Sequence, residues 1–136
     1  MSAAESCLCG AVRFTVVAPL GSVTASHCTQ CRKITGHHSA AVPAKWADIA
    51  LSGTVAWHAS SPGARRGFCG TCESSLFWDG AGQNLSIHAG TLDGATGLRL
   101  AGHIFCADKG DYYRISDDLP PTPGADGALT TMVAGP

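Results

Sequence analysis

The sequence has little charge and no large excess of either sign. Only 14% of its 136 residues are charged, and nine basic against ten acidic residues leave a formal net charge of -1. Proteins that attract nucleic acid or an anionic membrane surface carry a basic excess, usually clustered on one face. The composition therefore argues against both kinds of partner.

The sequence also lacks a long apolar run. A membrane-spanning helix needs about 20 consecutive apolar residues, and no stretch of the chain comes near this length. The first ten residues have neither the basic start nor the apolar core of a secretion signal. We therefore expect a cytoplasmic protein with no membrane segment.

Short apolar stretches rich in β-branched and aromatic residues recur along the chain, and Gly or Pro usually separates them. They cover residues 11–17, 39–42, 54–58, 75–78, 85–89, 98–106 and 112–115. No window carries a sustained helical stripe, so only single turns are expected, at residues 31–35 and 44–50. The sequence predicts a mainly β fold of several short antiparallel strands.

The length suits one domain with its own core. We expect residues 1–120 to form that domain, stabilised by metal as argued below. From residue 119 onward the chain is rich in Pro, Gly and Ala and has little to bury. Residues 121–136 are therefore predicted to form an extended or disordered arm. The oligomeric state is left open.

Seven cysteines are many for a chain of this length. Cys106 stands alone, and the other six fall into three close pairs. The pairs are Cys7 with Cys9, Cys28 with Cys31, and Cys69 with Cys72. In a reducing compartment, thiols at such short spacings bind metal more often than they form disulfides, and zinc is the leading candidate.

One closed zinc site needs four thiolates and so uses two of the three pairs. The third pair is left with two thiolates, and spacing alone does not say which pair that is. Two other interpretations remain open. The cysteines can be buried and unreactive, or Cys28 and Cys31 can form a redox dithiol, although the βαβ surroundings of thioredoxin-like motifs are missing.

Four motifs and a closing stretch follow one another in a specific order. They are C-L-C-G-A-V from Cys7, S-H-C-T-Q-C-R-K-I-T-G from Ser26, F-C-G-T-C from Phe68, H-I-F from His103 and D-K-G-D-Y-Y-R-I-S-D-D-L-P from Asp108. Together they resemble the glutathione-dependent formaldehyde-activating enzyme family, which also includes centromere protein V. The resemblance covers residues 7–120, and the order of the motifs is more specific than any one of them.

The resemblance implies two zinc sites. A structural zinc ion would be held by Cys7, Cys9, Cys69 and Cys72. At the second site, family members use three cysteines in a C-x-C-x-x-C run and leave a fourth position for the thiol of glutathione. Here the run begins with Ser26, so only Cys28 and Cys31 match. A neutral hydroxyl is a poor zinc ligand beside a thiolate, so we expect this second site to be weakened or altered.

Histidines near the second pair could replace its missing ligand. His27 lies inside the motif, and a turn could bring His37 or His38 back towards the two thiols. Each can equally be a surface or hydrogen-bonded histidine. His58 and His88 belong to no motif and are expected to be structural or exposed.

Basic residues flank two of the cysteine pairs. Arg32 and Lys33 follow the second pair, and Arg65 and Arg66 precede the third. Such residues are usually solvated surface, but they could also face the carboxylates of an anionic thiol. We take Arg32 and Lys33 as the candidates for binding glutathione.

Three further positions are assigned no catalytic role. His103 and Cys106 lie three residues apart on a predicted strand, where alternation sends them to opposite faces. They are not expected to share a metal ion, and Cys106 is expected in the core. Glu73 stands where many members of the resembled family carry glycine, a minor variation.

The resemblance implies a zinc-dependent carbon–sulfur lyase-type activity. Zinc bound by Cys28 and Cys31 would lower the pKa of the glutathione thiol, which would attack formaldehyde to give S-hydroxymethylglutathione. No carboxylate pair or Cys-His dyad can be recognised in the sequence as an obligatory general acid or base. The alternative is a non-catalytic zinc-binding module of the same family, whose second site has decayed at Ser26. Whether the chain is an enzyme therefore stays open at this point.

Overall fold

The computed structural model of the chain describes residues 3–17 and 19–125. This part of the chain is mainly β, as the sequence predicts. Its strands are β1 (Ala3–Ser6), β2 (Arg13–Val16), β3 (Val23–Ser26), β4 (Ser39–Lys45), β5 (Ile49–Ser52), β6 (Val55–Ser61), β7 (Ala64–Cys69), β8 (Ser75–Asp79), β9 (Asn84–His88) and β10 (Leu100–Ile104). Its helices are α1 (Thr29–Thr35) and the 3-10 turns η1 (Trp46–Asp48), η2 (Ala89–Thr91) and η3 (Cys106–Asp108).

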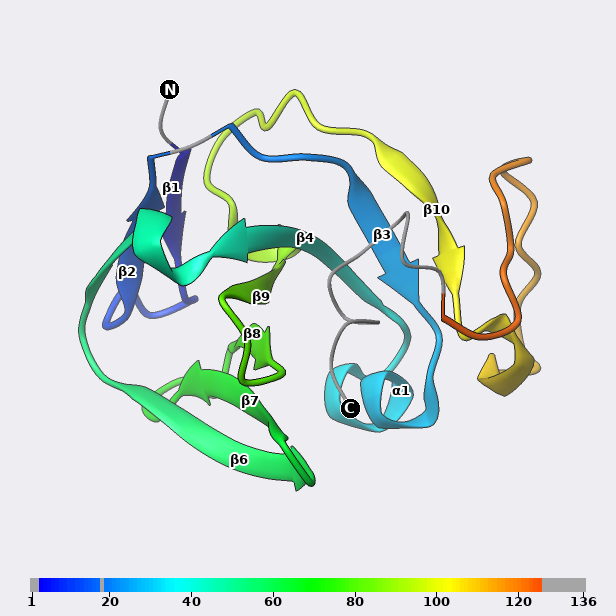
Figure 1. The fold of residues 1–136 in the computed structure, drawn as a ribbon, viewed down its shortest axis with the longest axis horizontal. Coiled ribbons are helices and arrows are strands. Elements are labelled where there is room, and N and C mark those ends of the chain that lie inside the picture. The colour runs from blue at the N-terminus through cyan, green and yellow to red at the C-terminus, as the bar shows by residue number, and fades with distance from the viewer. Residues whose placement is uncertain (1–2, 18, 126–136) are drawn as a thin grey trace.

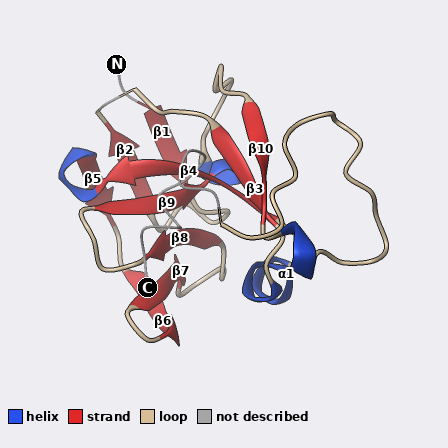
Figure 2. Cartoon of the chain, turned by 45° about the vertical axis from the view of Figure 1, so that its right-hand side comes forward, coloured by secondary structure: helices blue, strands red, loops and turns tan. Residues whose placement is uncertain are grey.

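The strands form two sheets. A three-stranded sheet has the order β1-β2-β5, and a seven-stranded sheet has the order β10-β3-β4-β9-β8-β7-β6. The larger sheet runs from β10 at the upper right of Figure 1 to β6 at the lower left. Its neighbouring strands are antiparallel except for β10 and β3, which run parallel. Helix α1 lies beyond the end of β3 (Figure 2).

The core lies between the two sheets. On β2, Phe14 and Val16 are buried while Arg13 is exposed, which is the alternation of a strand with one face covered. The ring of Phe14 contacts that of Phe77 on β8, with centroids 4.8 Å apart. Burial of these apolar side chains is the main source of the fold's stability.

The sequence located six strands and missed four. Each predicted stretch from residues 11–17 to 98–106 contains a strand, namely β2, β4, β6, β8, β9 or β10. The predicted strand at residues 112–115 is wrong, because that segment forms a turn and a loop. Its two tyrosines, Tyr112 and Tyr113, hydrogen-bond to histidines instead. The missed strands β1, β3, β5 and β7 are short or polar and depend on their neighbours for pairing.

The segment after residue 119 lies beside β10 and pairs with it in the parallel direction, between His103 and Pro121. The backbone N–H of His103 donates to the carbonyl of Pro120 (2.8 Å), and Thr122 N–H donates to the carbonyl of His103 (2.9 Å). The N–H of Phe105 donates to the carbonyl of Gly124 (2.8 Å). Residues 126–136 of the predicted arm lie outside the described part. Within the described part, no helix is long and apolar enough to cross a membrane.

Candidate metal and thiol-binding site

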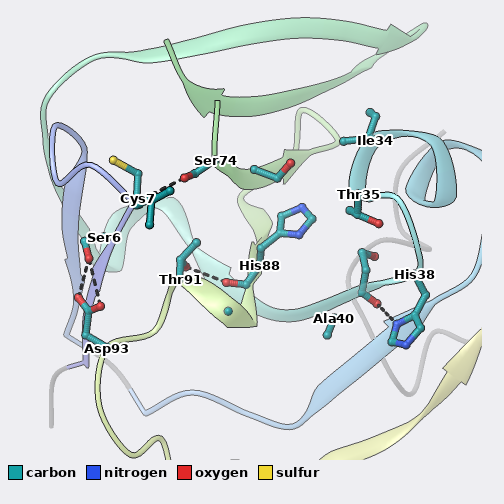
Figure 3. Close-up of a pocket in the computed structure, with 14 residues that line it drawn as sticks. Ser6, Cys7, Ile34, Thr35, His38, Ala40, Ser74, His88, Thr91 and Asp93 are labelled. Atoms are coloured by element: carbon teal, nitrogen blue, oxygen red, sulfur yellow. Dashed lines mark hydrogen bonds between the residues drawn. The ribbon is translucent and has the colours of Figure 1, made fainter. Parts of the chain in front are cut away.

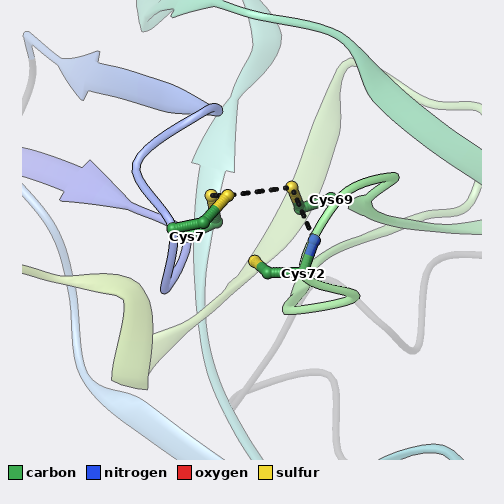
Figure 4. A group of neighbouring side chains, drawn as sticks. Cys7, Cys69 and Cys72 are labelled. Carbon is green, nitrogen blue, oxygen red and sulfur yellow. Dashed lines mark hydrogen bonds between the residues drawn. The ribbon is translucent and has the colours of Figure 1, made fainter.

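Four cysteines from distant parts of the chain meet between the two sheets. Cys7 and Cys9 lie in the loop after β1, Cys69 ends β7, and Cys72 lies in the turn before β8 (Figure 4). Their four sulfur atoms lie within 4.8 Å of one another. The Cys7 and Cys9 sulfurs are 3.7 Å apart, and those of Cys9 and Cys69 are 3.8 Å apart. Sulfurs bound tetrahedrally to zinc at about 2.3 Å stand about 3.8 Å apart, so the donor set fits that ion.

Backbone N–H groups support these sulfurs. Val12 N–H donates to the Cys7 sulfur (3.3 Å), and this bond lowers the pKa of the Cys7 thiol. Thr71 N–H donates to the Cys69 sulfur (3.4 Å). Gly10 has φ 79°, the left-handed conformation that glycine adopts readily in such a loop. Charge on the Cys7 sulfur is thus favoured before a metal binds.

The second cysteine pair lies at the start of α1. Cys28 caps the helix, and its sulfur accepts a hydrogen bond from Cys31 N–H (3.2 Å). The helix ends at Gly36, which has φ 84° and donates its N–H to the carbonyl of Arg32. Ser26, the last residue of β3, is buried, and its Oγ lies 3.4 Å from the Cys31 sulfur. The hydroxyl at the substituted position therefore faces the thiols.

The two thiols are hydrogen-bonded to each other, with Cys28 donating to the Cys31 sulfur at 3.0 Å. The pKa of Cys31 is lowered to about 4, first by this bond, then by the hydroxyls of Ser26 and Ser39 and by the charge of Arg66. Cys31 is thus the more acidic thiol of the pair.

Two adjoining cavities lie near the second cysteine pair, although neither Cys28 nor Cys31 lines them. One cavity, of about 680 Å³, is lined by Cys7 and His88 (Figure 3). It is also lined by Ser39, which hydrogen-bonds to Cys31. The other, of about 370 Å³, is lined by Arg66. Ile34, Ser75 and His88 line both cavities, so the two adjoin.

Comparison with known proteins identifies the family. The model of the glutathione-dependent formaldehyde-activating enzyme family matches residues 2–108, more than half of the chain. The chain belongs to this family. The membership expected from the order of the cysteine motifs is thereby confirmed.

A solved structure adds evidence for the fold alone. A crystal structure of a Rhodobacter sphaeroides protein, a Northeast Structural Genomics target, superposes on this family member with a TM-score of 0.57. The two chains are 17% identical over 71% of this chain and 98% of the other. No curated protein matches the chain.

The basic residues fall in places that the sequence did not predict. Arg32 donates from Nε to the carbonyl of Asp108 (2.9 Å), Lys33 is exposed, and neither lines the two cavities. Arg66 is buried with 5% of its surface exposed, and its Nη2 lies 3.7 Å from the Cys31 sulfur. Its neighbour Arg65 faces the other side of β7, pairing with Asp79 (3.0 Å).

A hydrogen-bonded chain of side chains, which the sequence analysis missed, adjoins the second cysteine pair. Its members are Asp117, His103, His27 and Tyr113. His103 Nε2 lies 2.8 Å from Asp117 Oδ2, and its Nδ1 lies 2.9 Å from His27 Nε2. His27 Nδ1 bonds to the hydroxyl of Tyr113. Burial, followed by the neighbouring histidines, lowers the pKa of His27 to about 4. Only the family motifs around these residues hinted at a role, because 86 positions separate His27 from Tyr113.

The histidines considered as replacement ligands are engaged in other bonds here. Both ring nitrogens of His27 take part in the chain just described. His37 Nδ1 bonds to the hydroxyl of Tyr112 (2.7 Å), and His38 Nδ1 bonds to the carbonyl of Ser39 (3.3 Å).

Cys106 differs from the sequence analysis, which expected it in the core. Cys106 lies after β10, in η3, and is half-buried, so it does not share the strand with His103. His58 is exposed, and His88 is half-buried between the two cavities.

Proposed function

We propose that the chain is a zinc-dependent carbon–sulfur lyase-type enzyme that joins the thiol of glutathione to formaldehyde, giving S-hydroxymethylglutathione. One observation carries the proposal. Cys28 and Cys31 are not among the four clustered cysteines, and Ser39 and Arg66, which contact Cys31, each line a cavity. Membership of a family described as glutathione-dependent and formaldehyde-activating supports this substrate pair.

Each cysteine group has its own part in the proposal. Cys7, Cys9, Cys69 and Cys72 would hold a structural zinc ion. Cys28 and Cys31 would hold a second zinc ion, which when bound supplies a Lewis acid that keeps the glutathione sulfur as thiolate. Arg32 and Lys33, at the exposed side of α1, remain candidates for contact with the outer part of glutathione. These roles assume the reducing conditions of the cytoplasm.

The reaction asks little of the protein beyond positioning. The thiolate forms a bond to the carbonyl carbon, the carbon–oxygen double bond becomes single, and the oxygen takes up one proton. No oxidant or reductant is needed. Holding sulfur and carbonyl together in the cavity beside the second cysteine pair would supply most of the rate gain.

A rate measurement tests the proposal. Glutathione and formaldehyde also combine in buffer without the protein, and NMR follows the appearance of the hydroxymethyl adduct in both cases. We expect the wild-type chain to accelerate this step and Cys28→Ser to abolish the acceleration. Cys106→Ser, whose sulfur lies outside both groups, serves as the matched control and should keep it. A wild-type rate equal to that in buffer would refute the enzymatic function.

A specific observation favours one alternative, a non-catalytic zinc-binding module. The buried Ser26 hydroxyl occupies the place from which family members present a third thiolate. The amount of zinc bound by protein purified without added metal separates the two. Close to one zinc per chain and no acceleration would favour the module, whereas close to two supports the enzyme.

A further inference from the structure

Arg66 is a buried cation without a carboxylate partner. Its Nη2 donates to the neutral amide oxygen of Gln30 (3.2 Å), and its buried Nε has no hydrogen-bond partner. Within residues 3–17 and 19–125, no carboxylate lies within ion-pair distance of Arg66. Taking a guanidinium out of water carries a large free-energy cost unless an anion compensates it. The Cys31 sulfur lies 3.7 Å from Nη2. An anionic ligand bound beside Arg66 would supply the missing negative charge.

The smaller cavity has the right lining for such a ligand. Arg66 contributes the positive charge, Phe68 and Phe77 contribute an apolar wall, and Glu73 contributes a carboxylate. Glu73 has φ 65°, a left-handed conformation that is strained for a residue with a side chain. Arg66 and Glu73 thus place opposite charges on the lining of one cavity.

We propose that this cavity, the Arg66 pocket, binds the α-amino acid end of a small thiol, with its carboxylate at Arg66 and its ammonium at Glu73. The inference rests on the proposed function, because the thiol sulfur would then extend from the pocket towards Cys31, whose sulfur lies 3.7 Å from Arg66 Nη2. Glutathione carries one such end, on its γ-glutamyl residue. Selectivity therefore favours thiols with a free α-amino carboxylate over simple alkyl thiols.

Calorimetric titration of the full chain with glutathione tests this placement. Arg66→Met keeps the length of the side chain and removes the charge, so glutathione affinity should fall at least about tenfold. Arg66→Lys keeps the positive charge but cannot donate two parallel hydrogen bonds to a carboxylate, so its glutathione affinity should fall less than that of Arg66→Met. Arg65→Met is the matched control, since Arg65 is the neighbour on β7 with a 48% exposed side chain, and should stay within about twofold of wild type.

Chemically altered probes examine the two ends of the ligand. Glu73→Gly should weaken binding of glutathione and leave binding of N-acetylglutathione unchanged, because the acetylated nitrogen carries no charge. Thermal melting shows whether Arg66→Met folds. If it does not fold, the affinities of Arg66→Lys and Glu73→Gly for glutathione still test the pocket.

The outcomes separate this proposal from the proposed function. Equal glutathione affinity in wild type and all Arg66 variants would overturn the Arg66 pocket and leave the enzyme proposal standing. S-methylglutathione binding as tightly as glutathione, with the same dependence on Arg66, would support the pocket and remove the sulfur contact that the enzyme proposal needs. No binding of either compound would overturn both.

Discussion

His27 Nε2 lies 2.9 Å from His103 Nδ1, and both rings are buried. The direction of the proton in this bond follows from the far end of the chain. The Asp117 carboxylate only accepts, so His103 Nε2 carries a hydrogen, and in a neutral ring its Nδ1 then accepts from His27 Nε2. His27 Nδ1 is left as an acceptor, and the hydroxyl of Tyr113 donates to it. One set of tautomers satisfies every member of the chain.

Removing the hydroxyl at the end of this chain should destabilise the fold. Tyr113→Phe leaves the buried His27 acceptor unpaired, which we expect to lower the free energy of unfolding by about 1–3 kcal/mol. Tyr112→Phe is the matched control, because Tyr112 is 64% exposed and bonds to the exposed His37, and it should cost less than about 0.5 kcal/mol. Urea denaturation measures both. Equal losses in the two variants would contradict the tautomer assignment.

The four-cysteine cluster should carry much of the stability of the domain. Cys69→Ser removes a thiolate from a set whose sulfurs fit one zinc ion, so the melting temperature should fall by more than about 10 °C together with loss of bound zinc. Cys106→Ser, outside the cluster, should change neither. Calorimetry and metal analysis on the same samples decide the matter. A Cys69→Ser protein with unchanged melting temperature and zinc content would rule out a structural metal there.

Restoring the third thiolate should strengthen the second metal site. Ser26 is buried and faces the Cys31 sulfur at 3.4 Å, so Ser26→Cys would present its sulfur inward without a change of backbone. We expect zinc affinity at this site to rise at least about tenfold, because a thiolate replaces a neutral hydroxyl. Competition with a zinc chelator compares the two proteins. If wild type and Ser26→Cys retain a second zinc ion equally tightly, Ser26 does not weaken zinc binding at this site.

Stability should fall as the pH drops below about 6.5, in part because of His88. Burial lowers the pKa of His88 from its usual 6.5, and the charge of Arg66 acts in the same direction. The unfolded chain therefore binds more protons than the folded one in the window below 6.5, so the free energy of unfolding decreases as the pH falls through it. Urea midpoints at about pH 7.5 and about pH 5.5 should differ less in His88→Gln than in wild type. The exposed His58→Gln serves as control, and identical pH dependence in all three proteins would show that His88 contributes nothing.

Glycine at position 73 should stabilise the folded chain. Glu73 adopts φ 65°, a conformation that glycine enters without steric penalty, so Glu73→Gly should gain about 1 kcal/mol. The control is Thr71→Gly in the same turn, which should gain nothing because Thr71 is not among the described residues with positive φ. Chemical denaturation measures the difference. A loss of stability in Glu73→Gly would mean that its carboxylate makes a compensating contact.

Much of the candidate site could be predicted from the sequence because close cysteine spacing is a local property. The pairs at Cys7, Cys28 and Cys69 indicated metal binding, and the family motifs indicated which two pairs would join. The structure brings those two pairs together. Strands β2 and β8 could also be predicted from the sequence, because their apolar residues recur within a few positions.

The tertiary structure alone decided which charges and rings face the site. Arg65 and Arg66 are equivalent in the sequence, yet alternation along β7 leaves one exposed and the other buried against the Cys31 sulfur. His27 and Tyr113 are 86 positions apart and meet only because the segment after β10 folds back over the end of β3. Sequence spacing fixes contacts within one turn or one strand, whereas contacts between distant segments depend on how the sheets pack, and that packing placed the buried cation beside the Cys31 sulfur.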